Sequence, residues 1–376
     1  MEYKRLGDIA TYINGYPFKP EQRGTTGLPI IRIQDLTGNA YDLGFYDGNY
    51  PERIEINDGD VLISWSASLG VYVWNRGKAL LNQHIFKVAF DKCAVNKQYF
   101  VYAVQHKLQE METKAHGATM KHIVKKDFDN TVIPFPTLEE QEEIAKIINH
   151  ASGIIFARQQ QLQKLDELVK ARFVEMFGIY PANQMGWETG KIRDTVADVR
   201  YGSSRPAVDG GKYPYLRMNN ITYGGELDLS DVKRIDVPEN ELDKCTVRRG
   251  DVLFNRTNSK ELVGKTCVYD RDEMMVLAGF VIRVRVNDRV LPEFLSAFLN
   301  TDFSKKTLSE MCKAAIGQAN INAQEMQNIG LYLPPLELQR QFVQFKKQTD
   351  KSKVVVQKAL DEAQTLFDSL MQQYFG

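Results

Sequence analysis

Two polar loops in this chain carry side chains of the kinds that contact nucleic acid. The string SWSAS occupies 64–68 and NRTNSK occupies 255–260, each after a Gly-Asp-Val-Leu segment that predicts a strand. Arginine forks onto guanine, asparagine pairs with adenine, and hydroxyl groups bind phosphates, so both loops suit DNA. The DNA-binding candidates in these loops are Ser64, Trp65, Ser66, Ser68, Asn255, Arg256, Thr257, Asn258 and Lys260.

These loop residues also have a plainer interpretation. A polar loop after a strand is often a solvated hairpin tip, and burial is the commoner fate of a tryptophan such as Trp65. The two loops differ far more than the strands that precede them. Divergence on a shared scaffold is expected if each loop reads a different sequence, although surface drift gives a similar pattern.

Two glycine-containing loops and one exposed cluster add further candidates. GATMKHI at 117–123 precedes two lysines, and GQANI at 317–321 occupies the matching place in the second half. Flexible backbone beside amides and cations suits close approach to a phosphate or a base, whereas a helix C-cap with a connector is the alternative. These candidates are Thr119, Lys121, His122, Lys125, Lys126, Gln318 and Asn320, together with Arg200, Tyr201, Ser203, Ser204 and Arg205.

Signatures of catalysis are absent or broken in the sequence. Gly264-Lys265-Thr266 ends like a phosphate-binding loop, but Ser259 stands where that motif needs glycine. No G-x-G-x-x-G follows a strand, and the Asn/Asp-Pro-Pro-Tyr/Phe tetrapeptide of amino-methyltransferases is missing. The cysteines show no C-x-x-C spacing and the histidines no H-E-x-x-H. We therefore expect no catalytic residue, no metal site and no cofactor bound by this chain.

Composition places the chain among soluble proteins that have more than one domain. At 376 residues it is too long for one ordinary core, and 43% hydrophobic with 26% charged residues is typical of globular proteins. No apolar run reaches the roughly 18 residues that span a bilayer, and the N-terminus lacks a signal-peptide core, so a cytoplasmic protein without a membrane partner is expected. A net charge of zero argues mildly against indiscriminate coating of nucleic acid.

A long repeat supplies the elements that would position the loops. Residues 134–178 match 332–376 at one unbroken offset, and Gln141 falls on Gln339. Apolar residues recur mostly three or four apart in both segments, which predicts two helices of about 40 residues and roughly 60 Å. A helix of that length with one apolar stripe must pair, and the obvious partner is the other helix, in an antiparallel coiled coil.

The segments between these helices predict two related modules of mixed α/β (α+β) class. Short β-branched runs such as IIRI, DVLF and FVIRVRV read as strands, and helical stretches follow them. Arg32 and Arg217 lie within such runs, so we expect structural ion pairs or backbone contacts from them. The predicted organisation is a first domain at 1–137, a central helix at 138–178, a linker at 179–186, a second domain at 187–334 and a last helix at 335–376.

The doubled layout resembles the specificity subunit of type I restriction-modification systems. GDVL-type strands, a glycine loop, and PFPTLEEQ or LPPLELQ before a long helix occur in order in both halves. The resemblance covers essentially the whole chain. Two departures from the family pattern are Met120, where many relatives have glutamine, and Thr137, where the second copy keeps Pro335.

This resemblance implies a division of labour. Each target recognition domain would bind half of a split site in double-stranded DNA, and the helices would set the gap and dock two methyltransferase subunits. The partners would bring S-adenosylmethionine, and a translocase-nuclease subunit that uses ATP and Mg could join them. Docking is expected through the repeated helix starts, at Leu138, Ile144, Ile148, Leu336, Phe342 and Phe345.

Three other interpretations remain open at this point. The chain could serve a related system whose methylase and nuclease are fused. A protein-only coiled-coil scaffold fits the neutral charge but fits the divergent Arg, Asn, Gln and Ser loops poorly. A self-contained methylase or nuclease would need the cofactor loop and the catalytic tetrapeptide that the sequence lacks.

Overall fold

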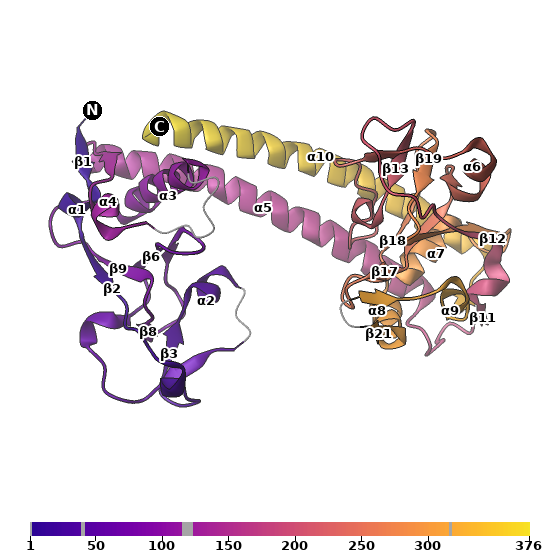
Figure 1. Cartoon of the computed structure of the whole chain (residues 1–376), viewed down its shortest axis with the longest axis horizontal. Helices are drawn as coiled ribbons and strands as arrows, with labels where there is room; N and C mark the ends of the chain where they lie inside the picture. The colour runs from indigo at the N-terminus through magenta and orange to yellow at the C-terminus, as the bar shows by residue number, and fades with distance from the viewer. Residues whose placement is uncertain (1, 39–41, 115–122, 316–317) are drawn as a thin grey trace. The chain divides into compact units, whose positions relative to one another are not determined.

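The computed structural model describes residues 2–38, 42–114, 123–315 and 318–376. It divides into two compact units. Unit 1 comprises Met1–Arg158 and Lys358–Gly376, and unit 2 comprises Gln159–Gln357. Each unit contains one α/β module, the first module or the second module, together with a part of each long helix (Figure 1).

The first module, indigo to purple in Figure 1, contains two four-stranded sheets. Their strand orders are β2-β9-β6-β7 and β4-β3-β8-β5, and β1 pairs with β10. Its strands are β1 (Tyr3–Arg5), β2 (Thr11–Asn14), β3 (Leu28–Ile31), β4 (Gly44–Tyr46), β5 (Glu55–Ile56), β6 (Val61–Ser64), β7 (Gly70–Val73), β8 (Ala79–Leu81), β9 (Ile85–Ala89) and β10 (Val132–Pro134). Its helices are α1 (Leu6–Ile9), α2 (Ile33–Thr37), α3 (Lys97–Lys114) and α4 (Lys125–Asp129).

The second module repeats this topology. Its sheets run β12-β20-β16-β18 and β14-β13-β19-β15, β11 pairs with β23, and β17-β22-β21 form a small sheet. Its strands are β11 (Glu188–Lys191), β12 (Val196–Tyr201), β13 (Tyr213–Leu216), β14 (Lys233–Ile235), β15 (Thr246–Val247), β16 (Val252–Asn255), β17 (Thr257–Asn258), β18 (Thr266–Val268), β19 (Met275–Leu277), β20 (Val281–Val286), β21 (Lys313–Ala315), β22 (Gln318–Asn320) and β23 (Gly330–Leu333). Its helices are α6 (Glu239–Cys245), α7 (Pro292–Leu299), α8 (Asp302–Met311) and α9 (Ala323–Gln327).

The Gly-Asp-Val-Leu strands are the centre of each module because both of their faces are buried. In β6, Val61 and Ile63 pack against the cluster that contains the helices, whereas Leu62 packs against the second sheet. Leu253 of β16 lies likewise between the two sheets. Alternating side chains point to opposite faces of a strand, so a short continuous apolar run is what a strand buried on both sides requires. The predicted α/β class with two repeated domains is confirmed.

One predicted strand ends earlier than expected, at Arg32, and this arginine and its counterpart Arg217 are both structural. The sequence predicts that the run IIRI is strand throughout, but β3 ends at Ile31 and α2 begins at Ile33. The Asp35 carboxylate accepts from the Arg32 backbone N–H at 2.8 Å and pairs with its guanidinium at 3.1 Å, which favours a helix start over a strand. In the second module Arg217 pairs with Asp231 at 2.8 Å. The structural role predicted for both arginines is confirmed.

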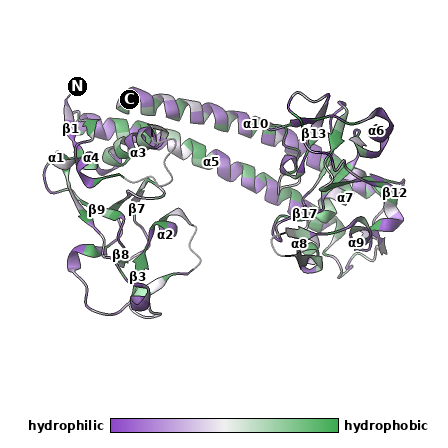
Figure 2. Cartoon of the chain, in the orientation of Figure 1, coloured by the Kyte–Doolittle hydropathy of each residue, from purple (hydrophilic) through white to green (hydrophobic). Residues whose placement is uncertain are grey.

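The long helices α5 (Leu138–Phe177) and α10 (Leu336–Phe375) contain 40 residues each. In unit 1 the first turns of α5 share a core with Met371 and Phe375 at the end of α10. In unit 2 Phe173 near the end of α5 packs edge-on against Phe342 near the start of α10, with ring centroids 5.2 Å apart. The two helices are therefore antiparallel. Figure 2 shows apolar and polar residues alternating along both, as expected for helices with one apolar stripe.

Two equivalent glutamines explain why the helix starts are alike in sequence. Gln141 is buried, accepts a bond from the Asn96 N–H at 2.9 Å and donates one to the Pro136 carbonyl at 2.9 Å. Gln339 is fully buried, accepts from the Leu291 N–H at 2.8 Å and donates to the Pro334 carbonyl at 2.8 Å. Each glutamine thus ties its long helix to the module before it. An apolar substitute for such a buried amide would destabilise the anchor, because the backbone groups would lose their partners.

The structure corrects part of the docking expectation. Ile144 and Ile148 belong to the core of unit 1, where Ile148 is 0% exposed, and Phe342 is 0% exposed in the core of unit 2. These three residues pack the long helices into the cores of their own units and offer no surface to a partner. The helix stripe pattern could not separate a residue that faces the module from one that faces outward. Among the described residues, no helix is both long and apolar enough to cross a bilayer.

Candidate nucleic-acid interface

In the second module the fold brings together two candidate regions that lie far apart in the sequence. The Arg256 backbone N–H donates to the Phe280 carbonyl at 3.0 Å, and its own carbonyl accepts from the Ile321 N–H at 2.9 Å. Strand β17 directly after it pairs with β22, with Thr257 opposite Asn320. The Asn255–Lys260 loop and the predicted glycine loop therefore form one surface.

Arg256 is the most suitable side chain on this surface for contact with a base or a phosphate. Its guanidinium carbon lies 4.9 Å from the centre of the Tyr201 ring, and Nη1 makes only a long 3.5 Å contact to the Gly279 carbonyl. The Tyr201 hydroxyl accepts from the Ala323 N–H at 2.9 Å, which fixes the ring. A guanidinium held against an aromatic ring loses little entropy when it binds. Its Nε is buried without a partner, so the Nη donors are the ones that a base or a phosphate could reach.

Three other candidates in this region are structural residues instead. Asn255 is 0% exposed, its side-chain oxygen accepts from the Thr257 N–H at 3.2 Å, and its amide group points at the Met218 carbonyl. Thr257 and Ser203 are also buried. The expectation that these three contact DNA is corrected, because residue type and loop position in the sequence carry no information on burial.

The remaining candidates of the second module vary in how much they can offer. Ser204, Lys260 and Asn320 are exposed, whereas Asn258 is half-buried and caps the Ser259 N–H at 2.9 Å. Arg205 is exposed but paired with Glu241 at 2.8 Å. Gln318 begins β22, and its side chain lies outside the described part of the chain.

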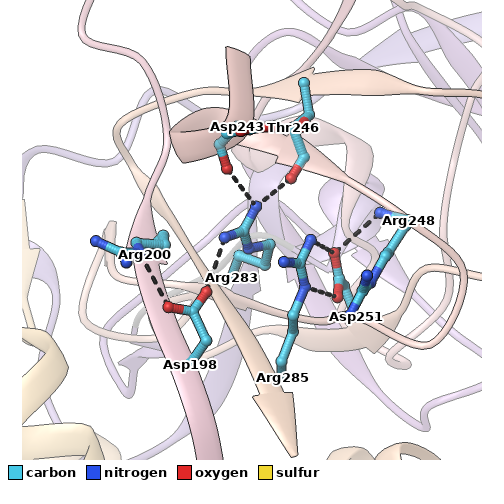
Figure 3. Close-up of polar contacts among 8 residues, drawn as sticks. All are labelled: Asp198, Arg200, Asp243, Thr246, Arg248, Asp251, Arg283 and Arg285. Carbon is cyan, nitrogen blue, oxygen red and sulfur yellow. Dashed lines mark hydrogen bonds and ion pairs between the residues drawn. The ribbon is translucent and has the colours of Figure 1, made fainter. Parts of the chain in front are cut away.

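Arg200 belongs to a network of charges on the opposite face of β12 from Tyr201. Figure 3 shows Asp198 between Arg200 and Arg283, with oxygen-to-nitrogen distances of 2.9 and 2.8 Å, and Asp251 joined to Arg285 at 2.8 Å. Burial alone would raise the pKa of Asp198, but bonds and charges from the two arginines outweigh it and lower that pKa. Arg200 is thus engaged by a carboxylate, and the network mainly fastens β12 to β20.

The first module carries Trp65 at the position of Arg256. The Trp65 N–H donates to the His84 carbonyl at 3.3 Å, and its carbonyl accepts from the Ile123 N–H at 3.1 Å, the same two backbone bonds that hold Arg256. Its ring stacks on Phe86 with centroids 5.6 Å apart and meets His84 at 4.9 Å. Trp65 is half-buried and packs against the core of its own module, so the expected burial is only partial.

The serines around Trp65 divide in the same way as the residues around Arg256. Ser64 and Ser66 are buried, and the Ser64 hydroxyl donates to the Ser68 carbonyl at 2.5 Å. These two are structural, which corrects the expectation for them, whereas Ser68 is exposed. In the segment after the glycine loop, Lys125 pairs with Asp129 at 2.7 Å, and Lys126 is exposed. Thr119, Lys121 and His122 lie outside the described residues.

Two lysines that are not among the predicted DNA contacts lie beside the Arg256 loop. Lys265 ends the loop, and Lys305 of α8 donates from Nζ to the Gly264 carbonyl at 2.9 Å. The broken phosphate-loop motif at Gly264-Lys265-Thr266 was the one sequence signal that pointed here. Lys305 lies 41 positions after Gly264. The sequence gave no signal for it, since only the fold places α8 against that loop.

Nothing in the described part of the chain resembles a metal centre. Over residues 2–38, 42–114, 123–315 and 318–376, no three His, Cys, Asp or Glu side chains gather closely enough to hold an ion. The cysteines are free thiols, of which Cys245 and Cys267 are buried. Burial raises the pKa of Cys267 to about 12, so its sulfur stays protonated at neutral pH.

Comparison with known proteins places this architecture in a described group. The family model for the type I restriction modification DNA specificity domain matches the chain twice, at residues 1–167 and 185–363. Among curated proteins, the chain is 23% identical to the EcoBI specificity subunit of Escherichia coli, over 98% of the chain and 84% of that protein. It is also 23% identical to the EcoKI specificity subunit of Escherichia coli K12, over 98% and 86%.

Solved structures give the same fold. The S subunit of a type I restriction-modification system from M. genitalium aligns with a TM-score of 0.53 at 14% identity, covering 100% of this chain and 96% of that one. A chain from a study of complex assembly in the type I R-M system aligns with a TM-score of 0.59 at 16% identity, covering 99% and 97%. At such identities the likeness concerns the fold alone.

Proposed function

The chain belongs to the family of type I restriction-modification DNA specificity domains, and from this premise we propose that each module reads one half of a bipartite site in duplex DNA. As in its curated relatives, the chain is the specificity subunit of such a system. The address therefore resides in this chain, and the bond chemistry belongs to its partners.

One observation carries the proposal of modular reading. The two modules share strand order, register and backbone bonds up to the loop after the central strand, yet that position holds Arg256 in one and Trp65 in the other. Each module has its own core and its own loop surface. Two scaffolds with the same architecture and different contact groups are what independent recognition of two different half-sites requires.

Exchange of one module tests this proposal directly. Residues 187–334 are replaced by the equivalent module of a relative with a known target, and adenine methylation is mapped across the genome of cells that carry the chimera. One half of the methylated motif should change and the other half should stay. If both halves change, or neither does, the modules do not read independently.

We further propose that the paired helices set the gap between the half-sites. The helices pass from one unit to the other at Arg158 and Gln357. Insertion of four residues at both points adds about one turn, roughly 6 Å, which is close to the rise of two base pairs. The methylated motif should keep both half-sites while its gap grows by one or two base pairs. An unchanged gap would exclude the helices as the spacer.

We also propose that two methyltransferase subunits dock at the two equivalent helix starts. The equivalent residues Leu138 and Leu336 remain available, since Leu138 is 43% exposed and Leu336 is half-buried, and Phe345 is half-buried under Arg172. The partners would supply S-adenosylmethionine, and a nuclease subunit would add ATP and Mg. Leu138→Glu and Leu336→Glu should each lower the measured stoichiometry of the purified complex by one methyltransferase. Two retained copies in the double variant would place the dock elsewhere.

A further inference from the structure

Lys265 and Lys305 lie directly behind the loop that presents Arg256. The Lys265 carbonyl accepts from the Asn255 N–H at 2.8 Å, so this lysine closes the base of the loop. The Gly264 N–H donates to the Asn255 carbonyl at 2.8 Å, and the Gly264 carbonyl accepts from the Lys305 ammonium group at 2.9 Å. Both lysines are thus built into the frame of the candidate DNA-contacting loop.

Among the residues that the structure describes, no carboxylate balances these two positive charges. The Lys265 ammonium group is 2.8 Å from the Met218 carbonyl, its side chain is buried, and neither Lys265 nor Lys305 forms an ion pair with a described residue. Lys353 of the same unit, which is also largely buried, contacts Glu226 at 2.9 Å and Asp166. A carbonyl partner compensates an ammonium charge far less than a carboxylate does.

The surroundings of Lys305 add to the imbalance. Burial, with repulsion from Lys265 and from Lys170 on α5, lowers the pKa of Lys305 to about 8. Burial also lowers the pKa of Lys265. Lys305 lies near the N-terminus of α8, where the helix dipole is positive as well. The Tyr223 ring also contacts Lys305, with 5.3 Å between the ring centre and the lysine nitrogen.

We infer that Lys305, with the positive charges of Lys265 behind it and Lys170 beside it, binds a backbone phosphate of DNA held by the second module. This inference rests on the proposed function and assigns a phosphate contact that the loop sequences did not predict. A phosphate would supply the missing negative charge next to the loop that carries Arg256. The first module has glycine at the position of Lys265. Gly70 lies opposite Ser64 there, just as Lys265 lies opposite Asn255 in the second module.

A matched pair of neighbouring lysines tests the site. Lys305→Gln removes the charge, and Lys306→Gln is the control, because Lys306 is exposed and its nearest acid, Glu310, is 4.0 Å away. The full-length chain, alone or with its methyltransferase partner, is titrated with a random-sequence duplex of about 40 base pairs at several salt concentrations. Lys305→Gln should weaken binding about three- to ten-fold and reduce the salt slope by about 1, while the control stays near wild type.

The pH dependence of binding gives a second readout that a merely structural role would not move. If a phosphate restores an ordinary lysine pKa to Lys305, the complex takes up a proton on binding at alkaline pH. The affinity of the wild-type chain should then fall about ten-fold between about pH 7 and about pH 9, because the free chain loses this proton first. Lys305→Gln should flatten that fall, and Lys306→Gln should leave it unchanged.

The outcomes separate the inference from the function beneath it. If Lys305→Gln binds the duplex with the wild-type salt slope and pH dependence, the phosphate site is overturned and DNA recognition stands. Loss of methyltransferase binding with unchanged DNA binding would also overturn it, since the anion would then be an acidic side chain of that protein. If the wild-type chain and its complex bind no duplex even at low salt, the proposed function itself fails.

Discussion

The two modules differ most where their backbones agree best. Trp65 and Arg256 follow equivalent strands and make the same two backbone hydrogen bonds, one to the neighbouring strand and one from the segment after the glycine loop. Trp65 packs inward on Phe86, whereas Arg256 lies on Tyr201 with most of its donors unused. The side chain at this position therefore adds stability in the first module and binding capacity in the second.

The strand beside this position follows the same division. Asn14 of β2 occupies the position that Tyr201 of β12 has in the second module. Asn14 lies opposite Phe86 of β9, and Tyr201 lies opposite Ile282 of the equivalent strand β20. The first module thus has no aromatic ring at 14 on which an arginine could lie. A contact residue depends on the neighbouring side chain that holds it in place. Exchange of the loops alone would therefore separate Arg256 from the tyrosine ring that positions it.

Charge placed in the shared helix starts should have the largest effect. Ile148→Asp puts a carboxylate into the core of unit 1 and should destabilise that unit by about 4 kcal/mol or more. Phe345→Asp, at a half-buried position of α10, should cost much less. Hydrogen exchange of the full-length chain, followed by mass spectrometry, resolves the two units. Equal loss of protection in both variants would mean that burial does not distinguish these positions.

Trp65→Ala and Arg256→Ala sharpen the comparison at the equivalent position. Trp65→Ala should lower the stability of the first module by about 1–3 kcal/mol, because a half-buried ring that packs against the core is lost. Arg256→Ala should leave hydrogen exchange in the second module nearly unchanged. A stable first module after loss of Trp65 would show that the ring is held for binding and not for packing.

The binding side of the same comparison is smaller. Arg256→Ala should weaken recognition of the second half-site by about 1–3 kcal/mol if the guanidinium contacts a base. Methylation of the motif in cells and affinity for cognate against random duplexes measure this effect. Equal losses on both duplexes would reassign Arg256 to a phosphate contact.

The glutamine anchors should behave alike, unlike the loops. Gln141→Leu and Gln339→Leu each leave two backbone groups without a partner and should each cost about 1–3 kcal/mol. Exchange protection at the start of α5 and of α10 reports the two losses separately. A large cost in one module and none in the other would break the equivalence that the repeat implies.

Acid should weaken the attachment of β12 in the second module. The depressed pKa of Asp198 means that its stabilising contribution is present above the unfolded pKa of about 4 and is lost as pH falls through the lower folded pKa. Because the carboxylate is partly exposed, the effect should stay below about 1 kcal/mol. Asp198→Asn should remove the pH dependence of exchange in β12, and a slope that persists would point to another group.

The sequence by itself was sufficient for the architecture. The repeat, the apolar stripe of each long helix and the GDVL strands determined two related α/β modules and two antiparallel helices, because periodic burial leaves a direct trace in residue order. The identical Gln141 and Gln339 marked the helix starts, although their bonding to the preceding module was not readable. The boundaries that local bonds decide, such as the start of α2 at Ile33, were missed.

Which candidate side chains face outward was decided by the tertiary structure alone. Ser64 and Asn255 are as polar as their neighbours, yet both are buried because the strands that precede the loops end one residue later than polarity suggests. Lys305 meets Gly264 across 41 positions of sequence, a contact that only the packing of α8 creates. Residue type limits what a group can bind, but its neighbours decide burial and charge, and those neighbours come from distant parts of the chain.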